Sequence, residues 1–331
     1  MRSEGLQVVT GDLAVWETNR SALLLRWRLI SAATILTVVF ALLHLDYHYP
    51  MKGFDGVPVG GIWLLPLAVL FAVLGAAETL GLLAAKGHHP RRGAVYLGTI
   101  AVLAGVCMPM VWPLFLGKSY PTDCPLGRMG WPLVGVAFTV MLAFVQEMIS
   151  YQRPGGIVLR VALAIFTVCY VAIPLSFVVA LRMFENHQVG IVALLSLIAI
   201  VKCGDTGAYT FGRLFGRHKM SPKLSPGKTW EGAVGGIASS VGVALLFCYL
   251  ISPALVAQSS GVWWGWVLYG VLVAIAGMIG DLAESMIKRD MECKDSSTWL
   301  RGLGGALDIL DSIFFGAPIA YACWLSGLVI A

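Results

Sequence analysis

The chain has 331 residues, of which 58% are hydrophobic and only 12% are charged. Soluble domains carry about 25% charged and roughly 45–50% apolar residues, so this composition excludes an ordinary soluble domain, a disordered chain and a coiled coil. It predicts an integral membrane protein. The formal net charge of +5 adds little by itself, because basic residues beside a membrane chiefly report orientation.

Nine apolar runs along the chain predict nine membrane helices. A helix needs about 20 apolar residues to cross a hydrocarbon core roughly 30 Å thick. The predicted spans cover 29–45, 59–84, 94–116, 131–148, 157–181, 188–204, 232–251, 262–281 and 309–330. None of the runs alternates with the period of two that a barrel strand requires. We therefore expect an all-α integral membrane protein, with a cytoplasmic arm at 1–26 and a polytopic membrane domain at 27–331.

The Lys and Arg residues in the predicted loops indicate how the helices are oriented. Alternate loops, starting with the N-terminal arm, hold 17 Lys and Arg residues, and the opposite loops hold 4. Cytoplasmic loops are enriched in these residues, so we expect a cytoplasmic N-terminus in the inner membrane. Two segments on the same side, 205–232 and 280–312, stand apart because of their charge. Between 281 and 311 lie eleven charged residues, seven of them acidic, and acidic residues contribute little to orientation.

Two pairs of carboxylates stand at predicted helix ends. Asp281 and Glu284 lie three residues apart at the end of the eighth helix and share a face that Lys288 continues. Asp308 and Asp311 repeat this spacing where the ninth helix begins. If the two ends pack together, the four carboxylates repel unless protons or a metal neutralise them. Oxygen ligands of this kind favour Mg²⁺, whereas helix caps and loop ion pairs are the structural alternative.

The segment 205–232 has features of a phosphate-binding turn. Gly227, Lys228 and Thr229 are similar to the end of a P-loop, but that motif needs glycine where Pro222 stands and an apolar strand before it, so we exclude a P-loop. A helix that starts near Thr229, with Lys228 and the Ser225 hydroxyl beside it, would bind a phosphate through its backbone N–H groups. An ordinary turn followed by a helix N-cap is the alternative.

Further cations lie beside the carboxylates, at Lys288, Arg289, Lys294 and Arg301. A metal and several cations at one membrane face suit phosphoryl or nucleotidyl transfer, because they neutralise the transferring and leaving groups. A transporter or channel is the alternative from another class, since intramembrane charge also marks transport routes. The charges gather at one face, however, and no paired helix breakers indicate inverted repeats. Glu78 and Glu147, near predicted helix ends, are further candidates for lining a cavity.

These two charged blocks resemble a known family. The first runs from Asp205-Thr-Gly-Ala-Tyr to Ser225-Pro-Gly-Lys-Thr-Trp-Glu-Gly. The second comprises Gly280-Asp-Leu-Ala-Glu-Ser-Met-Ile-Lys-Arg, Lys294-Asp-Ser and Gly304-Gly-Ala-Leu-Asp-Ile-Leu-Asp-Ser. Together they are similar to the conserved regions of the membrane-bound phosphatidate cytidylyltransferases, or CDP-diacylglycerol synthases. The resemblance implies transfer of CMP from CTP to phosphatidic acid, which yields CDP-diacylglycerol and pyrophosphate.

The resemblance also implies a set of site residues and ligands. Asp281 and Asp308 correspond to metal ligands for Mg²⁺, which K⁺ can accompany, and the catalytic set is Asp281, Asp308, Asp311 and Lys288. Substrate binding is implied for Asp205, Ser225, Lys228, Thr229, Glu231, Glu284, Arg289, Lys294 and Asp295. The partners implied are CTP, phosphatidic acid, membrane lipids and a second copy of the chain in a homodimer, with no nucleic acid.

The chain departs from the family pattern at three positions. The pattern Pro-Gly-His-Gly-Gly is replaced by Arg301-Gly-Leu303-Gly-Gly, and Asp-Arg-x-Asp is replaced by Asp308-Ile309-Leu-Asp311. Because every carboxylate is retained, we expect an active variant, with Arg301 as a hypothetical source of the missing cation. The alternative enzyme is a CTP-dependent kinase of a long-chain lipid alcohol, of polyprenol or phytol type, which would release CDP.

Overall fold

The fold is an assembly of long apolar helices. The computed structural model describes residues 30–31, 33–52, 58–118, 120–121, 123–152, 154–256, 262–293, 297 and 304–329. In this part of the chain, eight helices are long and apolar enough to cross a membrane. A further apolar helix, Ala33–His48, belongs to a shorter class of 10–17 residues and coincides with the first predicted span. The prediction of an all-α integral membrane protein is therefore confirmed.

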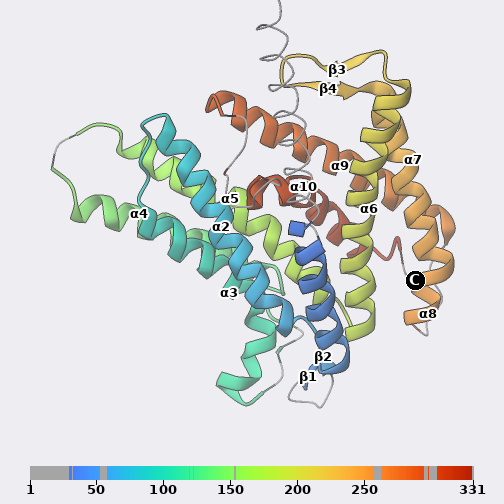
Figure 1. Ribbon diagram of the computed structural model, residues 1–331. Coiled ribbons are helices and arrows are strands. Elements are labelled where there is room, and N and C mark those ends of the chain that lie inside the picture. Colours follow the sequence, from blue (N-terminus) through green and yellow to red (C-terminus); the bar gives the residue numbers. More distant parts are fainter. Residues whose placement is uncertain are drawn as a thin grey trace, which may run out of the picture.

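The helices follow the predicted order of apolar runs (Figure 1). After the short η1 (Ile62–Leu64), the bundle comprises α2 (Leu65–Ala85), α3 (Arg92–Leu116), α4 (Gly130–Ile149), α5 (Ile157–Arg182), α6 (His187–Phe215), α7 (Trp230–Leu246), α9 (Trp263–Asp290) and α10 (Ala306–Leu325). Helix α7 continues through η2 (Phe247–Ile251) and α8 (Ser252–Leu255) as one span. The main core joins α5, α6, α9 and α10 through buried side chains that include Val171, Leu197, Val273 and Phe314.

Two helices extend well beyond the predicted ends of their spans. Helix α6 runs to Phe215 rather than ending at 204, and α9 runs to Asp290 rather than 281. In the added part of α6, the hydroxyls of Thr206 and Thr210 donate to carbonyl oxygens four residues earlier, so these polar residues sit within the helix. The apolar run therefore marks the lipid-embedded part of each helix, while its polar continuation carries the charged residues of both blocks.

Two short antiparallel hairpins lie at opposite ends of the bundle (Figure 1). Strands β1 (Met51–Lys52) and β2 (Pro58–Val59) form one, and β3 (Lys219–Ser221) and β4 (Ser225–Thr229) form the other. The second hairpin falls in a segment predicted as loop, because its strands are too short and polar for a periodic signal. It leads directly into α7, whose N-cap is Thr229, and the predicted helix start near Thr229 is confirmed.

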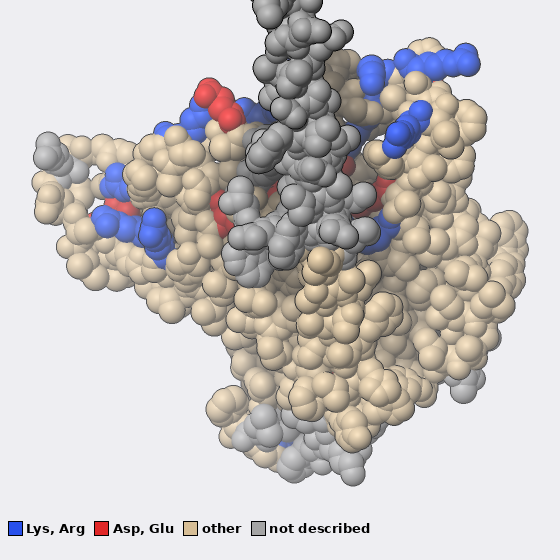
Figure 2. All heavy atoms as spheres, viewed as in Figure 1, with Lys and Arg blue, Asp and Glu red and all other residues tan. Residues whose placement is uncertain are grey.

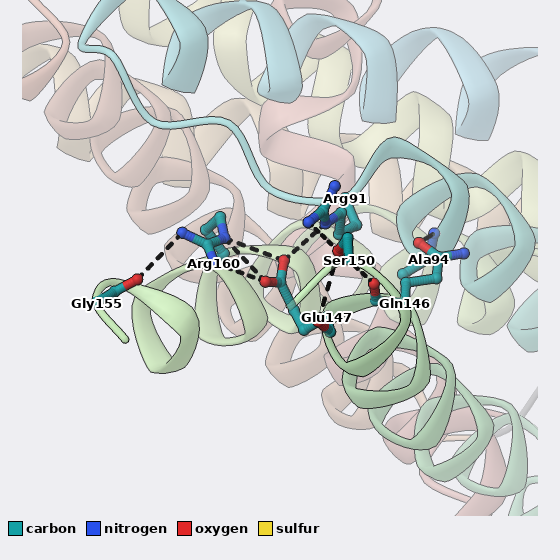
Figure 3. Close-up of polar contacts among 7 residues, drawn as sticks. All are labelled: Arg91, Ala94, Gln146, Glu147, Ser150, Gly155 and Arg160. Carbon is teal, nitrogen blue, oxygen red and sulfur yellow. Dashed lines mark hydrogen bonds and ion pairs between the residues drawn. The ribbon is translucent and has the colours of Figure 1, made fainter. Parts of the chain in front are cut away.

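Glu147 connects three helices at the α4–α5 turn (Figure 3). Its carboxylate, 3% exposed, lies 2.9 Å from Nε of Arg91 before α3 and 2.6 Å from Nη2 of Arg160 in α5. The neighbouring Gln146 side chain accepts from the backbone N–H of Ala94. Glu147 was considered for lining a cavity, but the structure uses it as a structural junction of α3, α4 and α5.

A second buried ion pair holds helix Ala33–His48 on the bundle at the other end. The Asp46 carboxylate pairs with the guanidinium of Arg182 at the end of α5, and both side chains are almost completely buried. Asp46 also accepts from the backbone N–H of Gly61 at 2.9 Å, while Arg182 donates to the His187 carbonyl at 3.1 Å. The charged groups thus find partners within the bundle, which favours their burial.

Candidate active site

Most of the charged side chains in view gather at one end of the molecule. Figure 2 shows Lys, Arg, Asp and Glu around the upper end, where Figure 1 places β3–β4 and the charged ends of α9 and α10. The sides of the bundle are formed by other residue types, as expected for a surface that faces lipid. In this view, the charged side chains lie mainly at the end of the bundle that carries both charged blocks.

Helices α9 and α10 meet closely at Gly280. A Cβ atom on this residue would lie 2.4 Å from the Asp311 carbonyl oxygen, so glycine is required for the approach. Next to this contact, Lys288 Nζ lies 2.9 Å from Oε2 of Glu284 and 2.7 Å from Oδ1 of Asp308. One ammonium group therefore bridges the predicted carboxylate pairs of the two helices.

Asp308 is held by the first turn of its own helix. Its Oδ2 accepts a hydrogen bond of 2.6 Å from the backbone N–H of Gly305, as in a capping box. The preceding Gly304 has a φ of +86°, and a Cβ there would meet the Asp308 carboxylate at 2.4 Å. The Gly304-Gly305 pair thus allows the chain to turn tightly around this carboxylate.

The β3–β4 hairpin brings the first block to the second. Lys228 Nζ lies 2.7 Å from Oδ2 of Asp281, and the Arg289 guanidinium donates to the Leu224 carbonyl at 3.4 Å. The hairpin is therefore fastened to α9 at two points. At its base, the Thr229 hydroxyl accepts from the backbone N–H of Gly232, which leaves the start of α7 beside Lys228.

Asp205 and Asp311 meet across α6 and α10. The Ser312 hydroxyl donates to Oδ1 of Asp205 at 3.3 Å and to Oδ1 of Asp311 at 3.1 Å. Lys202, one turn before Asp205, donates from Nζ to the Ile309 carbonyl at 2.8 Å. Lys202 was not predicted as a site residue because it stands inside an apolar run, although its spacing of three residues before Asp205 is a usable signal.

Glu78 of α2 supports this end of α10 from the side. Its two carboxylate oxygens accept from the backbone N–H groups of Ala306 at 2.8 Å and Leu307 at 2.9 Å, and one also accepts from the Ser297 hydroxyl. These N–H groups belong to the first turn of α10, which has no partners for them within the helix. Glu78, considered at first for lining a cavity, is therefore a cap for the helix that carries Asp308 and Asp311.

With both charged blocks at one end of a membrane bundle, comparison with known proteins decides the family. The model of the cytidylyltransferase family matches residues 26–326. The chain belongs to the cytidylyltransferase family. The predicted resemblance is thereby confirmed over nearly the whole membrane domain.

Individual members of the cytidylyltransferase family match a smaller part of the chain. The phosphatidate cytidylyltransferase of Haemophilus influenzae is 39% identical over 129 residues, which are 39% of this chain and 44% of the relative. That of Chlamydia trachomatis is 37% identical over 167 residues, or 49% and 54% of the two chains. An uncharacterized Escherichia coli protein is 39% identical over 144 residues, or 42% and 46%. The chain thus spans about half the length of the relatives it matches.

Two predicted site residues make their contacts within the β3–β4 hairpin and its base. Glu231 holds the foot of the hairpin, where its Oε1 lies 2.6 Å from Nδ1 of His218 and its carboxylate accepts from the Arg217 backbone N–H. Ser225 lies at the start of β4, where it pairs with Ser221. Four further residues of the sequence analysis lie outside the described part of the chain: Lys294, Asp295, Arg301 and Leu303.

The carboxylates of this family member fit a hard divalent cation in their chemistry. In the described residues, no three Asp, Glu, His or Cys side chains form a group ready to hold a metal, and lysines pair with Asp281 and Asp308. Oε1 of Glu284 is buried without a hydrogen-bond partner among the described residues. An unsatisfied carboxylate oxygen beside further carboxylates is a donor set that suits Mg²⁺.

Proposed function

We propose that this family member transfers CMP from CTP to phosphatidic acid and releases pyrophosphate, which forms CDP-diacylglycerol. Two ion pairs carry the proposal, Lys228–Asp281 and Lys288–Asp308. They bring the residues of both charged blocks together at the end of a membrane bundle. The Haemophilus and Chlamydia relatives are named phosphatidate cytidylyltransferases. A lipid substrate and a charged nucleotide can both reach such a site.

The reaction needs positioning and neutralisation of charge more than proton transfer. The phosphate monoester of phosphatidic acid is already ionised near neutral pH, with a second pKa of about 6, and attacks the α-phosphorus of CTP as pyrophosphate leaves. Lys228 and Lys288 would exchange their carboxylate partners for phosphate oxygens and neutralise the charge that develops. Arg289, the Thr229 hydroxyl and the N–H groups at the start of α7 are further phosphate donors.

The carboxylates have two roles in this proposal. Asp281 and Asp308 would hold Mg²⁺, which would neutralise charge on the reacting phosphates, and K⁺ can accompany it. Glu284 would keep Lys288 oriented, while Asp205 and Asp311 meet at the Ser312 hydroxyl. When a nucleotide occupies the lysines, Asp281 and Asp308 become available as ligands.

The active site would face the cytoplasm across the inner membrane. The loops on the side of 205–232 and 280–312 hold most of the Lys and Arg residues, which is typical of cytoplasmic loops. CTP and Mg²⁺ would therefore arrive from the cytoplasm, while phosphatidic acid would reach the site from the adjoining leaflet. This orientation also requires a cytoplasmic N-terminus.

The proposal is tested by an assay in mixed micelles with phosphatidic acid, labelled CTP and Mg²⁺. Equal amounts of lipid-bound cytidine and pyrophosphate, both abolished by EDTA, would support it. Formation of CDP only when a long-chain alcohol is supplied would replace it with the lipid-alcohol kinase. If neither lipid leads to consumption of CTP, the proposed activity is wrong.

A further inference from the structure

An apolar cavity of about 440 Å³ lies between helix Ala33–His48 and the bundle. Its walls are formed by helix Ala33–His48 together with η1, α2, α5, α6 and α10. Among the described residues that line it, the charged side chains are Arg182 and Lys202, and the others are apolar. Arg182 stands at the end of α5, and Lys202 stands in the second half of α6. The α6 residues that line the cavity run from Leu194 to Lys202, which is roughly 12 Å at about 1.5 Å per residue.

The helix that closes this cavity is fastened at one end. Of its described side chains, Leu43 and Asp46 are the buried ones, and both lie near its C-terminal end. Ile35 and Val39, nearer its beginning, line the cavity, while Val38 is 44% exposed on the outside. The ion pair of Asp46 with Arg182 therefore anchors a helix whose other half stands over open space.

Hydrocarbon is the occupant that fits this space. Protein interiors are close-packed with few voids larger than a water molecule, so a cavity of this size leaves many side chains without contacts. Water gains little in an apolar cavity, because it needs two to four polar partners. The length of roughly 12 Å is close to that of one leaflet of a hydrocarbon core about 30 Å thick, so a large part of a lipid chain has room to enter.

One end of the cavity reaches the candidate active site. Lys202 lines the cavity, donates to the Ile309 carbonyl at 2.8 Å and lies 3.6 Å from Asp205. Ile309, which directly follows Asp308, lines the same cavity. At the position where the family pattern has arginine, this chain thus completes an apolar wall, and Lys202 supplies a cation at its border.

We propose that this cavity binds one acyl chain of the lipid substrate, with the lipid phosphate beside Lys202. The acyl chain would enter from the bilayer past the first half of helix Ala33–His48, while the ion pair of Asp46 stays in place. The identity of the lipid rests on the proposed function. The location of the acyl chain rests on the cavity, its apolar walls and the cation at its border.

Photolabelling tests the proposal without requiring turnover. The full-length protein is placed in vesicles that contain phosphatidic acid with a diazirine in the middle of one acyl chain, and adducts are mapped by mass spectrometry after irradiation. We expect adducts on the cavity-lining segments of α5, α6 and α10, near Leu175, Ile198 and Ile313. The same diazirine chain on phosphatidylcholine is expected to label these segments less, because its phosphate is shielded by choline.

Two tryptophan variants fill the cavity from opposite walls. Val39→Trp and Ile198→Trp are each expected to lower cavity adducts at least about tenfold, since one methylene in an apolar pocket already changes binding by roughly 10–200-fold. Val38→Trp is the matched control, because the same change on the adjacent, exposed residue leaves the cavity open. If Ile198→Trp fails to fold, Val39→Trp on the partly exposed helix still provides the test.

The outcomes separate this proposal from the proposed activity. Adducts confined to lipid-facing positions such as Phe138 would overturn the acyl-chain site. Equal labelling of Val39→Trp and of the wild-type protein would also overturn it. Equal labelling by phosphatidylcholine would overturn recognition of the substrate headgroup. Cavity adducts without formation of lipid-bound cytidine would support the acyl-chain site and reject the cytidylyltransferase activity. Cytidine transfer without cavity adducts would support the activity and reject the acyl-chain site.

Discussion

Lys228 Nζ lies 2.7 Å from Oδ2 of Asp281, an ion pair that joins the β3–β4 hairpin to the second half of α9. The two residues belong to different charged blocks, so this contact makes one site of them. A lysine already beside a carboxylate needs only a small displacement to reach a phosphate, and an anionic nucleotide would compete with Asp281 for it. The proposed function therefore assigns this ion pair a role in catalysis.

Removal of either member of this pair should reduce activity strongly. Asp281→Asn is expected to abolish cytidine transfer without unfolding the protein, because it removes a charge assigned to the metal. Lys228→Ala is expected to lower kcat about 10²–10³-fold, the usual cost of losing one group that stabilises developing charge. Both are measured in the micelle assay at saturating Mg²⁺, with circular dichroism as the measure of folding.

Lys223→Ala is the matched control for Lys228→Ala. Lys223 is exposed in the turn between β3 and β4, so its removal changes the charge of the hairpin equally without affecting the Asp281 contact. Its kcat should equal that of the wild type. Substantial turnover by Asp281→Asn at saturating Mg²⁺ would contradict the assignment of this residue to the metal.

Lys288 is expected to contribute to stability as well as to charge neutralisation. Its side chain is 15% exposed and bridges Glu284, which is 3% exposed, and Asp308. Lys288→Met leaves two carboxylates facing each other in a poorly hydrated place, and removal of one partner of a buried pair costs about 3–5 kcal/mol. The free energy of unfolding in mixed micelles measures this loss.

A double variant tests whether the unpaired carboxylates cause the loss of stability in Lys288→Met. Adding Glu284→Gln to Lys288→Met removes one of the stranded charges, so the double variant should recover part of the lost stability while remaining inactive. If the double variant were less stable than the single one, the ion pair would not be the source of the loss. A double-mutant cycle gives the coupling energy directly.

The sequence predicted which helices carry the charged residues, but it did not predict the long-range contacts that hold those helices. The spacing of Asp281 with Glu284 and of Asp308 with Asp311 correctly placed each pair within one helix, because periodicity is a local property, although α9 continues nine residues past Asp281. The contact of Glu78 with Ala306 spans 228 positions and depends on how α2 packs beside α10, which no local pattern encodes. Lys202 was hidden in an apolar run because the hydropathy of its neighbours outweighs a single charge.

The sequence did not predict the apolar cavity either. The charged groups of α6, α9 and α10 meet at the candidate active site. The cavity is lined by residues of α2, α5, α6 and α10 and by the helix that the Asp46–Arg182 ion pair joins to the bundle. Both residues stand in separate apolar regions, and only the packing of the helices makes them partners.

Glu147 should matter for stability and not for catalysis. Glu147→Ala removes the acceptor of Arg91 and Arg160, and a hydrogen bond to a charged group contributes roughly 1.5–3 kcal/mol. Both arginines are about one-third exposed and regain water, so we expect a loss near the low end of this range, measured by unfolding in micelles. Arg92→Ala is the control, because this exposed neighbour lies outside the network. A large change in kcat would contradict a purely structural role.

Glu78 is expected to position Asp308 by capping α10. Glu78→Ala leaves the backbone N–H groups of Ala306 and Leu307 without their acceptor, at a cost of about 1–3 kcal/mol for an unsatisfied buried group. Because the first turn of α10 then frays, Asp308 leaves Lys288 and kcat should fall. Glu78→Gln keeps one carbonyl acceptor and should restore part of both properties.

The test of Glu78 must distinguish positioning from general stability. The Mg²⁺ concentration for half-maximal activity should rise in Glu78→Ala, because the Asp308 ligand is misplaced, and should fall back in Glu78→Gln. Glu147→Ala serves as a comparison of similar stability in which this concentration stays at the wild-type value. If both alanine variants shifted the Mg²⁺ dependence equally, Glu78 would contribute only to folding, and the bond from α2 to α10 would have no separate role in catalysis.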